Sequence, residues 1–284
     1  MSESNKRNFI VHGSILAIAG ILVRIIGMLY RIPVVNIIGS EGNGIYGAAF
    51  NIYNIMLVLS SYGLPMAVSK LVSARFTKRR YKSAAKVLRC SLMVAVCTGG
   101  IAALLVFFGA SFIENVIYGG GLPGLAIPLR ILAPTIFLVA ILGVIRGFFQ
   151  GQSTMIPTAV SQILEQIVNA IVSIAAGYGM MKAFASSPDV AAYGAAGSTL
   201  GTAMGALTAV LFMGFLYAVY TPTFNRLKRK DRHTENQSTG QICKIIIYTM
   251  IPIILGQTFY QISALIDDVM FSNIMVGRDI TKSI

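Results

Sequence analysis

Apolar segments long enough to cross a bilayer alternate with short polar linkers along nearly the whole chain. A transmembrane helix needs about 20 mainly apolar residues, and seven segments meet this requirement. They lie at roughly 9–35, 45–72, 90–112, 125–149, 156–183, 192–220 and 243–266. The pattern predicts an all-α polytopic membrane protein with about seven transmembrane helices.

Composition agrees with this prediction. Hydrophobic residues make up 55% of the 284 positions and charged residues only 12%, whereas soluble domains carry about 25% charged residues. The net charge is +13, which could indicate a nucleic-acid-binding protein. The basic residues, however, concentrate in two linkers between apolar segments, and we therefore expect no nucleic-acid partner.

The polar linkers fall into a basic set and a set that contains no Lys or Arg. The basic linkers cover 75–89 and 226–232, with Lys244 just beyond, and the base-free linkers are 36–44, 111–124 and 186–190. The two sets alternate along the chain, so the positive-inside rule predicts a cytoplasmic N-terminus, with the odd-numbered segments running outward. The basic linkers can also contact anionic lipid head groups.

Transporters are often built from two repeated halves, and the seventh segment resembles the first in layout. We therefore expect a cytoplasmic tail at 1–8, a six-helix lobe at 9–220 and a basic cytoplasmic linker at 221–242. The part from 243 to 284 would be the first helix of an incomplete second lobe, with the missing half supplied by further sequence or by a partner chain.

The first apolar segment carries an arginine at its centre. Arg24 lies about 22 Å into the predicted helix, and a charge at that depth costs roughly 2.5–3.5 kcal/mol on insertion scales. Membrane proteins keep such a residue when it faces a polar cavity or a partner. Gly13, Gly20, Arg24, Gly27 and Arg31 share one helical face. We interpret this small, basic face as a cavity wall that binds an anionic group.

The fifth segment carries a second unusual charge, Glu165, about 14 Å into its helix and roughly 9 Å away in depth from Arg24. Pro157, Ser161, Glu165, Asn169 and Ser173 recur every four residues, and Gln162 and Gln166 lie alongside. Unpaired polar groups are costly in lipid. The stripe is therefore either a hydrogen-bonded seam between helices or a cavity lining, in which Glu165 balances charge or is linked to a proton or cation.

Two interruptions of helical pattern are candidates for hinges. Pro128 and Pro134 flank Arg130 near the outer end of the fourth segment and predict a kinked or broken helix. Arg130 either snorkels to the outer interface or helps Arg24 to bind an anion. Gly63-Leu-Pro65 interrupts the second segment. Each interruption is either an ordinary kink or a hinge for alternating access.

Motifs for nucleotide binding and hydrolysis are missing from the sequence: it contains neither GxxxxGK[ST] nor GxGxxG after a strand. Cys90, Cys97 and Cys243 fall in or beside apolar segments, where cysteine acts as a small apolar residue. His12 and His233 have no Cys or carboxylate at ligand spacing. We therefore expect no metal, no cofactor and no enzymatic activity, and interpret the chain as a secondary transporter or flippase.

Several short stretches carry a family resemblance. They are Val23-Arg-Ile-Ile-Gly27, Ile38-Gly-Ser-Glu-Gly-Asn-Gly-Ile-Tyr-Gly47, Gly63-Leu-Pro-Met-Ala-Val-Ser-Lys70, Arg146-Gly-Phe-Phe-Gln-Gly151 and Met155-Ile-Pro-Thr-Ala-Val-Ser-Gln-Ile-Leu-Glu-Gln166. Together they resemble the multidrug/oligosaccharidyl-lipid/polysaccharide (MOP) flippase superfamily. The resemblance runs from Asn8 to about Met275. It is to the branch of stage V sporulation protein B and related polysaccharide biosynthesis proteins, which is similar to the lipid II flippases.

This resemblance implies two facing six-helix lobes that move a lipid-linked oligosaccharide, such as a peptidoglycan precursor, across a bacterial plasma membrane. It also implies that Arg24 lines the central cavity and meets the pyrophosphate of the substrate. The lipid II flippases carry a further cavity arginine in the second segment, where this chain has Met56-Leu57-Val58-Leu59. Two alternatives are a cation-coupled multidrug exporter of the same superfamily and a non-transporting membrane subunit or remnant.

Overall fold

The computed structural model describes residues 3–232 and 237–277, and all regular secondary structure within them is helical. His233 lies outside the described residues, as does the chain beyond Gly277. The elements are α1 (Glu3–Ser60), α2 (Gly63–Thr77), α3 (Tyr81–Phe112), the π-helical turn η1 (Ile113–Ile117), α4 (Ala126–Gly151), α5 (Ile156–Ala183), α6 (Val190–Lys230) and α7 (Thr239–Gly277).

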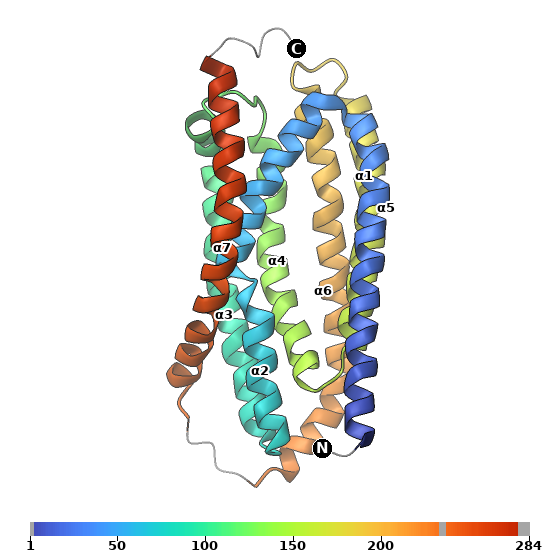
Figure 1. Ribbon diagram of the computed structural model, residues 1–284, viewed down its shortest axis with the longest axis vertical. Coiled ribbons are helices and arrows are strands. Elements are labelled where there is room, and N and C mark those ends of the chain that lie inside the picture. The colour runs from blue at the N-terminus through green and yellow to red at the C-terminus, as the bar shows by residue number, and fades with distance from the viewer. Residues whose placement is uncertain (1–2, 233–236, 278–284) are drawn as a thin grey trace.

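Helix α1 crosses the molecule twice. Its 58 residues would extend about 87 Å if straight, far more than a bilayer core of about 30 Å. Gly39 has φ 70° and ψ −176°, a conformation that is essentially restricted to glycine. Figure 1 shows α1 rising along one side of the molecule and then descending across it. The reversal therefore takes place at one residue rather than over the polar linker expected at 36–44.

The described residues contain six segments that are long and apolar enough to span a membrane. One of them, Ser14–Thr77, includes the reversal at Gly39 and passes through the molecule twice. With the other five segments this makes seven passes, so the prediction of an all-α polytopic protein with about seven transmembrane helices is confirmed. Helix α6 continues through Lys230 and α7 begins at Thr239, so the linker expected at 221–242 is largely helical.

The linkers separate by charge along the long axis of the molecule. The α2–α3 turn and the α6–α7 linker lie at the same end as the start of α1 in Figure 1, whereas the α3–α4 and α5–α6 connections lie at the opposite end. The basic sequence at 75–89 and 226–232 is therefore gathered at one end, as predicted. We call this the basic end; its assignment to the cytoplasm stays a prediction.

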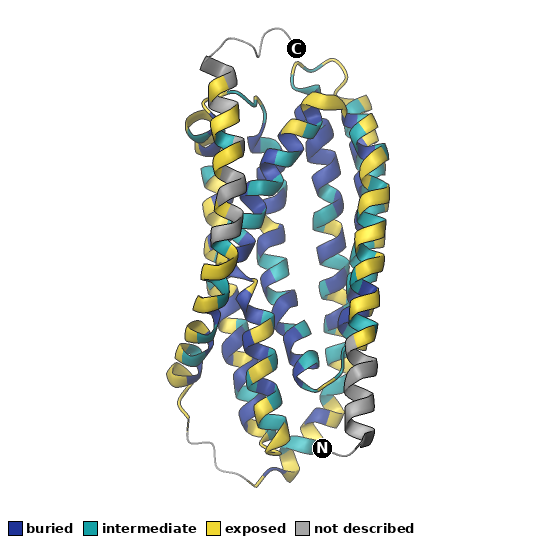
Figure 2. Ribbon diagram, in the orientation of Figure 1, coloured by how far each residue is buried: buried dark blue, intermediate teal, exposed yellow. Residues whose placement is uncertain are grey.

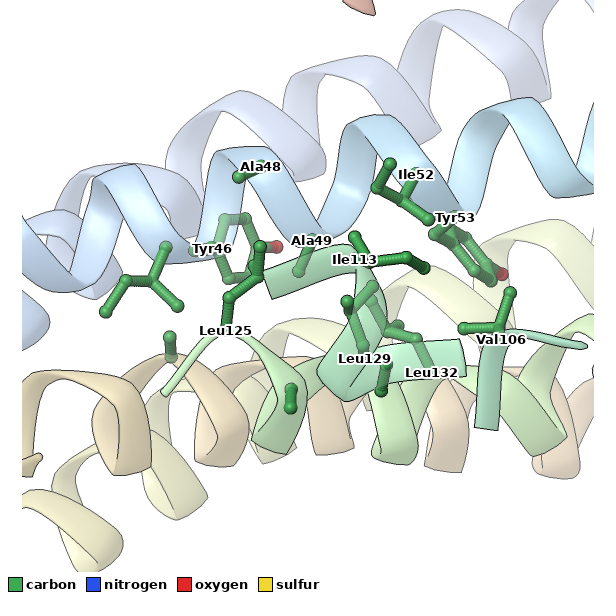
Figure 3. Close-up of a cluster of buried hydrophobic side chains, with 14 of the residues drawn as sticks. Tyr46, Ala48, Ala49, Ile52, Tyr53, Val106, Ile113, Leu125, Leu129 and Leu132 are labelled. Atoms are coloured by element: carbon green, nitrogen blue, oxygen red, sulfur yellow. The ribbon is translucent and has the colours of Figure 1, made fainter. Parts of the chain in front are cut away.

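Two apolar clusters hold the helices together. In the first, shown in Figure 3, the descending half of α1 packs on α4 and on the residue before it, through Tyr46, Ala49, Ile52, Tyr53, Leu125, Leu129 and Leu132. The second lies nearer the basic end and is centred on the fully buried ring of Phe148. Phe224 and Tyr217 pack edge-on against it, with ring centroids 5.3 and 5.8 Å away, in the geometry that aromatic pairs prefer.

Small residues bring α5 and α6 into close contact. A Cβ added to Gly205 would lie 2.6 Å from the Glu165 carbonyl oxygen, and one on Gly201 would collide with Ser173. Helices in lipid gain little from the hydrophobic effect and pack through such small residues instead. Figure 2 shows that α4 and much of α6 are buried, whereas many of the described residues in the first half of α1, from Ser14 on, and in α7 are exposed. Many of these exposed side chains are large and apolar, as lipid-facing or lobe-facing surfaces require.

Candidate functional site

The predicted basic face of α1 lies beside the predicted polar stripe of α5. Arg24 and Arg31 are exposed on the first half of α1. Between them, a Cβ added to Gly27 would lie 3.1 Å from Nε2 of Gln166 on α5. One turn along α1, the Tyr30 hydroxyl accepts a hydrogen bond from Asn169 Nδ2 at 3.2 Å. The structure thus brings together two sets of residues that are about 140 positions apart in the sequence.

Arg31 sits near the point where the two halves of α1 converge. Tyr30 and Arg31 both lie near the Tyr46 side chain on the descending half. Among the residues whose side chains the structure describes, no carboxylate forms an ion pair with Arg24 or Arg31. Two guanidinium groups inside a membrane-spanning segment are thereby left without an anion from the described part of the chain.

Glu165 pairs with an arginine that the sequence analysis did not select. Arg146 Nη2 on α4 donates to Glu165 Oε2 at 2.7 Å, and the two side chains are only 14% and 26% exposed. Arg146 Nε also donates to the Ser161 hydroxyl at 2.9 Å. A charge-assisted pair with a second hydrogen bond fixes both side chains. Charge balance for Glu165 therefore comes from α4 and not from Arg24.

The rest of the stripe divides between helix contacts and half-buried positions. The Ser173 hydroxyl lies 2.9 Å from Asn169 Oδ1 and 2.8 Å from the Ser198 carbonyl oxygen of α6. Thr202 adds a longer contact to Asn169 Oδ1 at 3.5 Å. Asn169 and Ser173 thus form an interhelical seam with α1 and α6. Gln162 and Gln166 are half-buried, and their role as cavity lining stays a prediction.

A signal for Arg146 was present in the sequence. It lies inside the fourth apolar segment and opens the stretch Arg146-Gly-Phe-Phe-Gln-Gly151. Its position close to the end of α4 lowers the apparent cost of the charge, because arginine can snorkel from there. Its burial depends on α5 packing over it, which no single segment reveals.

Arg130 of α4 contacts α3. Its Nη2 donates to the Ser111 hydroxyl of α3 at 2.9 Å, and the pair is exposed. This position, in the second turn of α4, fits the snorkelling interpretation. The structure joins Arg130 to α3, and its part in anion binding stays a prediction.

The prolines of α4 do not break the helix. Helix α4 is continuous from Ala126 to Gly151, so of the two predicted alternatives, a kinked or a broken helix, the structure does not show the break. Pro128 lies in the first turn, where backbone N–H groups have no helical partner in any case. Pro134 lies inside the helix. Bending at either proline stays a prediction.

Gly63 and Pro65 begin a new helix, as the interruption of the second segment predicted. Helix α1 ends at Ser60 and α2 begins at Gly63. Pro65 is in the first turn of α2 and packs closely on α4. A Cβ added to Gly147 of α4 would lie only 2.6 Å from the Pro65 carbonyl oxygen. On the other side, a Cβ on Gly63 would lie 2.8 Å from Met250 of α7. The break is thus held between α4 and α7, and its use as a hinge stays a prediction.

A groove of about 770 Å³ runs between α2 and α7. Lys70 of α2 and Lys244 of α7 provide its two charges, and Met66, Pro252 and Ile253 are among its apolar walls. The Lys244 ammonium also lies 5.7 Å from the centroid of the Tyr248 ring, which is within the range of a cation–π contact. The groove combines cations with an apolar surface, a composition that suits an amphipathic anion.

Sequence comparison places most of the chain within one family model. The model described as "Polysaccharide biosynthesis protein" matches residues 10–279. The lipid II flippase MurJ of Bacillus subtilis is 34% identical over 176 residues, which cover 60% of this chain and 32% of that protein. Stage V sporulation protein B of the same organism is 30% identical over 210 residues, covering 73% of this chain and 39% of the relative.

Solved structures show the same fold. A MATE transporter in its straight conformation has a TM-score of 0.70 at 17% identity, covering 89% of this chain and 53% of that one. A MOP superfamily transporter from Pyrococcus furiosus has a TM-score of 0.65 at 18% identity, with 86% and 52% coverage. The chain spans about half the length of these transporters and a third to a half of the curated relatives.

Proposed function

The chain belongs to the polysaccharide biosynthesis protein family of MOP superfamily transporters. On this premise we propose that it is part of a flippase for lipid-linked oligosaccharides. The protein would move a peptidoglycan precursor or another polysaccharide intermediate across the bacterial plasma membrane by alternating access. Because the chain spans about half the length of its relatives, we propose that it forms one lobe of the transporter. The second lobe would come from further sequence or from a partner chain.

The observation that carries this proposal is the exposed pair of guanidinium groups on α1. Arg24 and Arg31 lie in a membrane-spanning segment, exposed, and without a carboxylate partner among the described residues. A planar guanidinium can donate two parallel hydrogen bonds to a phosphate, and it does so more strongly in a dry cavity. A lipid-linked pyrophosphate is an anion that must reach such a depth. A cationic drug would be repelled there.

The α2–α7 groove supports the same class of substrate. Lys70 and Lys244 are cations at the boundary between the first lobe and the first helix of the second. Met66, Ile245 and Pro252 supply apolar walls to the same groove. A glycolipid has an anionic head and a long apolar tail, so a groove of this composition can receive both parts during loading.

Arg24→Ala in the intact protein tests the proposal. We expect this variant to lose complementation of a flippase-deficient strain while its amount in the membrane is unchanged, because the pyrophosphate loses its bidentate donor. Lys182→Ala is the matched control: it removes one exposed positive charge at the end of α5 and should complement fully.

Full complementation by Arg24→Ala would contradict the assignment of Arg24. Retained function after Arg24→Ala combined with Glu165→Ala would favour a non-transporting subunit, since neither deep charge would then be needed. A gain of resistance to cationic dyes on expression of the unaltered protein would favour a multidrug exporter.

A further inference from the structure

A basic pocket of about 460 Å³ lies between α3, the end of α6 and the start of α7. Its cations are Lys82, Lys86 and Arg89 from α3 and Lys228 from α6, and Met93 forms part of its wall. The volume lies within the range of about 300–1,000 Å³ that is usual for ligand sites. The pocket is at the basic end of the molecule, and it shares no lining residue with the α2–α7 groove.

The three cations of α3 are aligned along one face of the helix. Lys82, Lys86 and Arg89 are at positions i, i+4 and i+7, so their side chains are neighbours on the helix surface. Like charges at this spacing destabilise a helix. The positive-inside rule requires only that basic residues lie in the loops on one side of the membrane. It does not require them to share one helix face or to line a pocket. An anion bound in the pocket would offset the repulsion between these aligned cations.

The described residues that line the pocket do not neutralise this charge. Within the described residues, the pocket lining contains no carboxylate. The buried carboxylate of Asp231 accepts the backbone N–H of Lys82 at 2.8 Å, so it is engaged with the start of α3. The Lys86 ammonium donates to the Gln237 carbonyl oxygen, which orders the α7 side of the pocket and leaves the charge in place.

The same face of α3 becomes apolar and exposed as it enters the membrane. Met93, Val96 and Leu104 continue the stripe at i+11, i+14 and i+22 from Lys82, and all three are exposed. One helix face thus presents three cations and then an apolar strip. A phospholipid has the matching order of a phosphate head followed by acyl chains.

We infer that this pocket binds the phosphate head group of an anionic phospholipid from the leaflet at the basic end, with an acyl chain along Met93, Val96 and Leu104. The bound lipid joins α3 and α6 of the first lobe to the start of α7, the helix that leads into the second. This site is separate from the proposed substrate site and does not depend on the proposed function.

Native mass spectrometry of the intact protein in detergent tests this inference. Phosphatidylglycerol is titrated against the unaltered protein, the double variant Lys82→Gln with Arg89→Gln, and the control Arg226→Gln with Arg229→Gln. The control removes the same charge from exposed positions of α6 that do not line the pocket. Loss of two lysine or arginine contacts predicts a weakening on the order of tenfold or more for the pocket variant and little change for the control.

Two further arms separate the possible sources of the phosphate. Phosphatidylcholine and inorganic phosphate, each at the concentration used for phosphatidylglycerol, should bind much more weakly to the unaltered protein. Equal losses in the pocket variant and the control, or equal binding of inorganic phosphate, would overturn the inference. If the double variant does not fold, Arg89→Gln alone should still weaken phosphatidylglycerol binding severalfold; unchanged binding would again overturn it.

Discussion

At the residue scale, the ion pair of Arg146 with Glu165 connects α4 to the polar side of α5. Removing one member of a buried pair leaves the other charge without a partner in a poorly solvated place, and that costs more than the pair itself contributes. The Ser161 hydroxyl also depends on this arrangement, since it accepts from Arg146 Nε. The three side chains therefore act as one unit.

We expect Arg146→Gln to lower the free energy of unfolding by about 1–3 kcal/mol, the usual cost of an unsatisfied buried polar group. Thermal unfolding of the purified protein in detergent measures this change. Adding Glu165→Gln to the same chain should restore part of the loss, because no lone carboxylate then remains. Arg130→Gln is the control, since Arg130 is exposed with Ser111, and a loss as large as that of Arg146→Gln would contradict the argument.

The residue scale also shows where sequence reasoning reaches its limit. Arg24 and Glu165 could be selected from the sequence because a charge in the middle of an apolar segment has a calculable cost. Arg146 could not be paired with Glu165 in this way, because the pairing depends on how α4 and α5 are placed side by side. The contact of Gly27 with Gln166 on α5 is likewise a property of packing, and the sequence indicated only that the face of α1 around Gly27 is small and basic.

At the scale of elements, the apolar pattern located every spanning segment but not the form of the first turn. Polar and small residues at 36–44 are typical of a loop, yet the helix continues on both sides of Gly39. A loop and a sharply bent helix can both be rich in small and polar residues, so composition does not distinguish them. In the structure Ile38 is buried in the apolar core and the helix resumes directly after Gly39.

Gly39→Ala should therefore destabilise the protein by about 1–3 kcal/mol, because an alanine cannot adopt φ 70° with ψ −176° without strain. Gly44→Ala is the matched control in the same helix. An added Cβ meets nothing within 4 Å at Gly44, so alanine there should be neutral or stabilising by about 0.5–1 kcal/mol. Thermal unfolding of both variants measures the difference, and equal stabilities would show that Gly39 is not required for the reversal.

The α5–α6 contact gives a second prediction at this scale. A Cβ on Gly201 would lie 2.5 Å from the Asn169 carbonyl oxygen and 2.6 Å from the Ser173 nitrogen, and a helix backbone cannot move away cheaply. Gly201→Ala should therefore cost about 1–3 kcal/mol through overpacking. Gly214→Ala, in open space on the same helix, should stabilise slightly. The two melting temperatures should move in opposite directions, and a parallel shift would argue against close packing at Gly201.

At the scale of the whole molecule, the two ends differ in the charge of their linkers. The basic linkers meet at the end where α1 begins, and the base-free linkers meet at the other end. One consequence is that the proposed lipid pocket and the mouth of the α2–α7 groove, with Lys70 and Lys244, belong to the basic half of the molecule. If that end faces the cytoplasm, both sites are placed on the side where lipid-linked precursors would be loaded.

Cysteine labelling in intact cells decides this orientation. In a background with Cys90→Ala, Cys97→Ser and Cys243→Ser, Lys78→Cys places one thiol on the α2–α3 turn, and Ser186→Cys places one on the α5–α6 connection; both positions are exposed. We expect a membrane-impermeant maleimide to label Ser186→Cys in intact cells and to label Lys78→Cys only after permeabilisation, because basic linkers are retained in the cytoplasm. The reverse pattern would contradict the orientation, and with it the loading of substrate from the basic end.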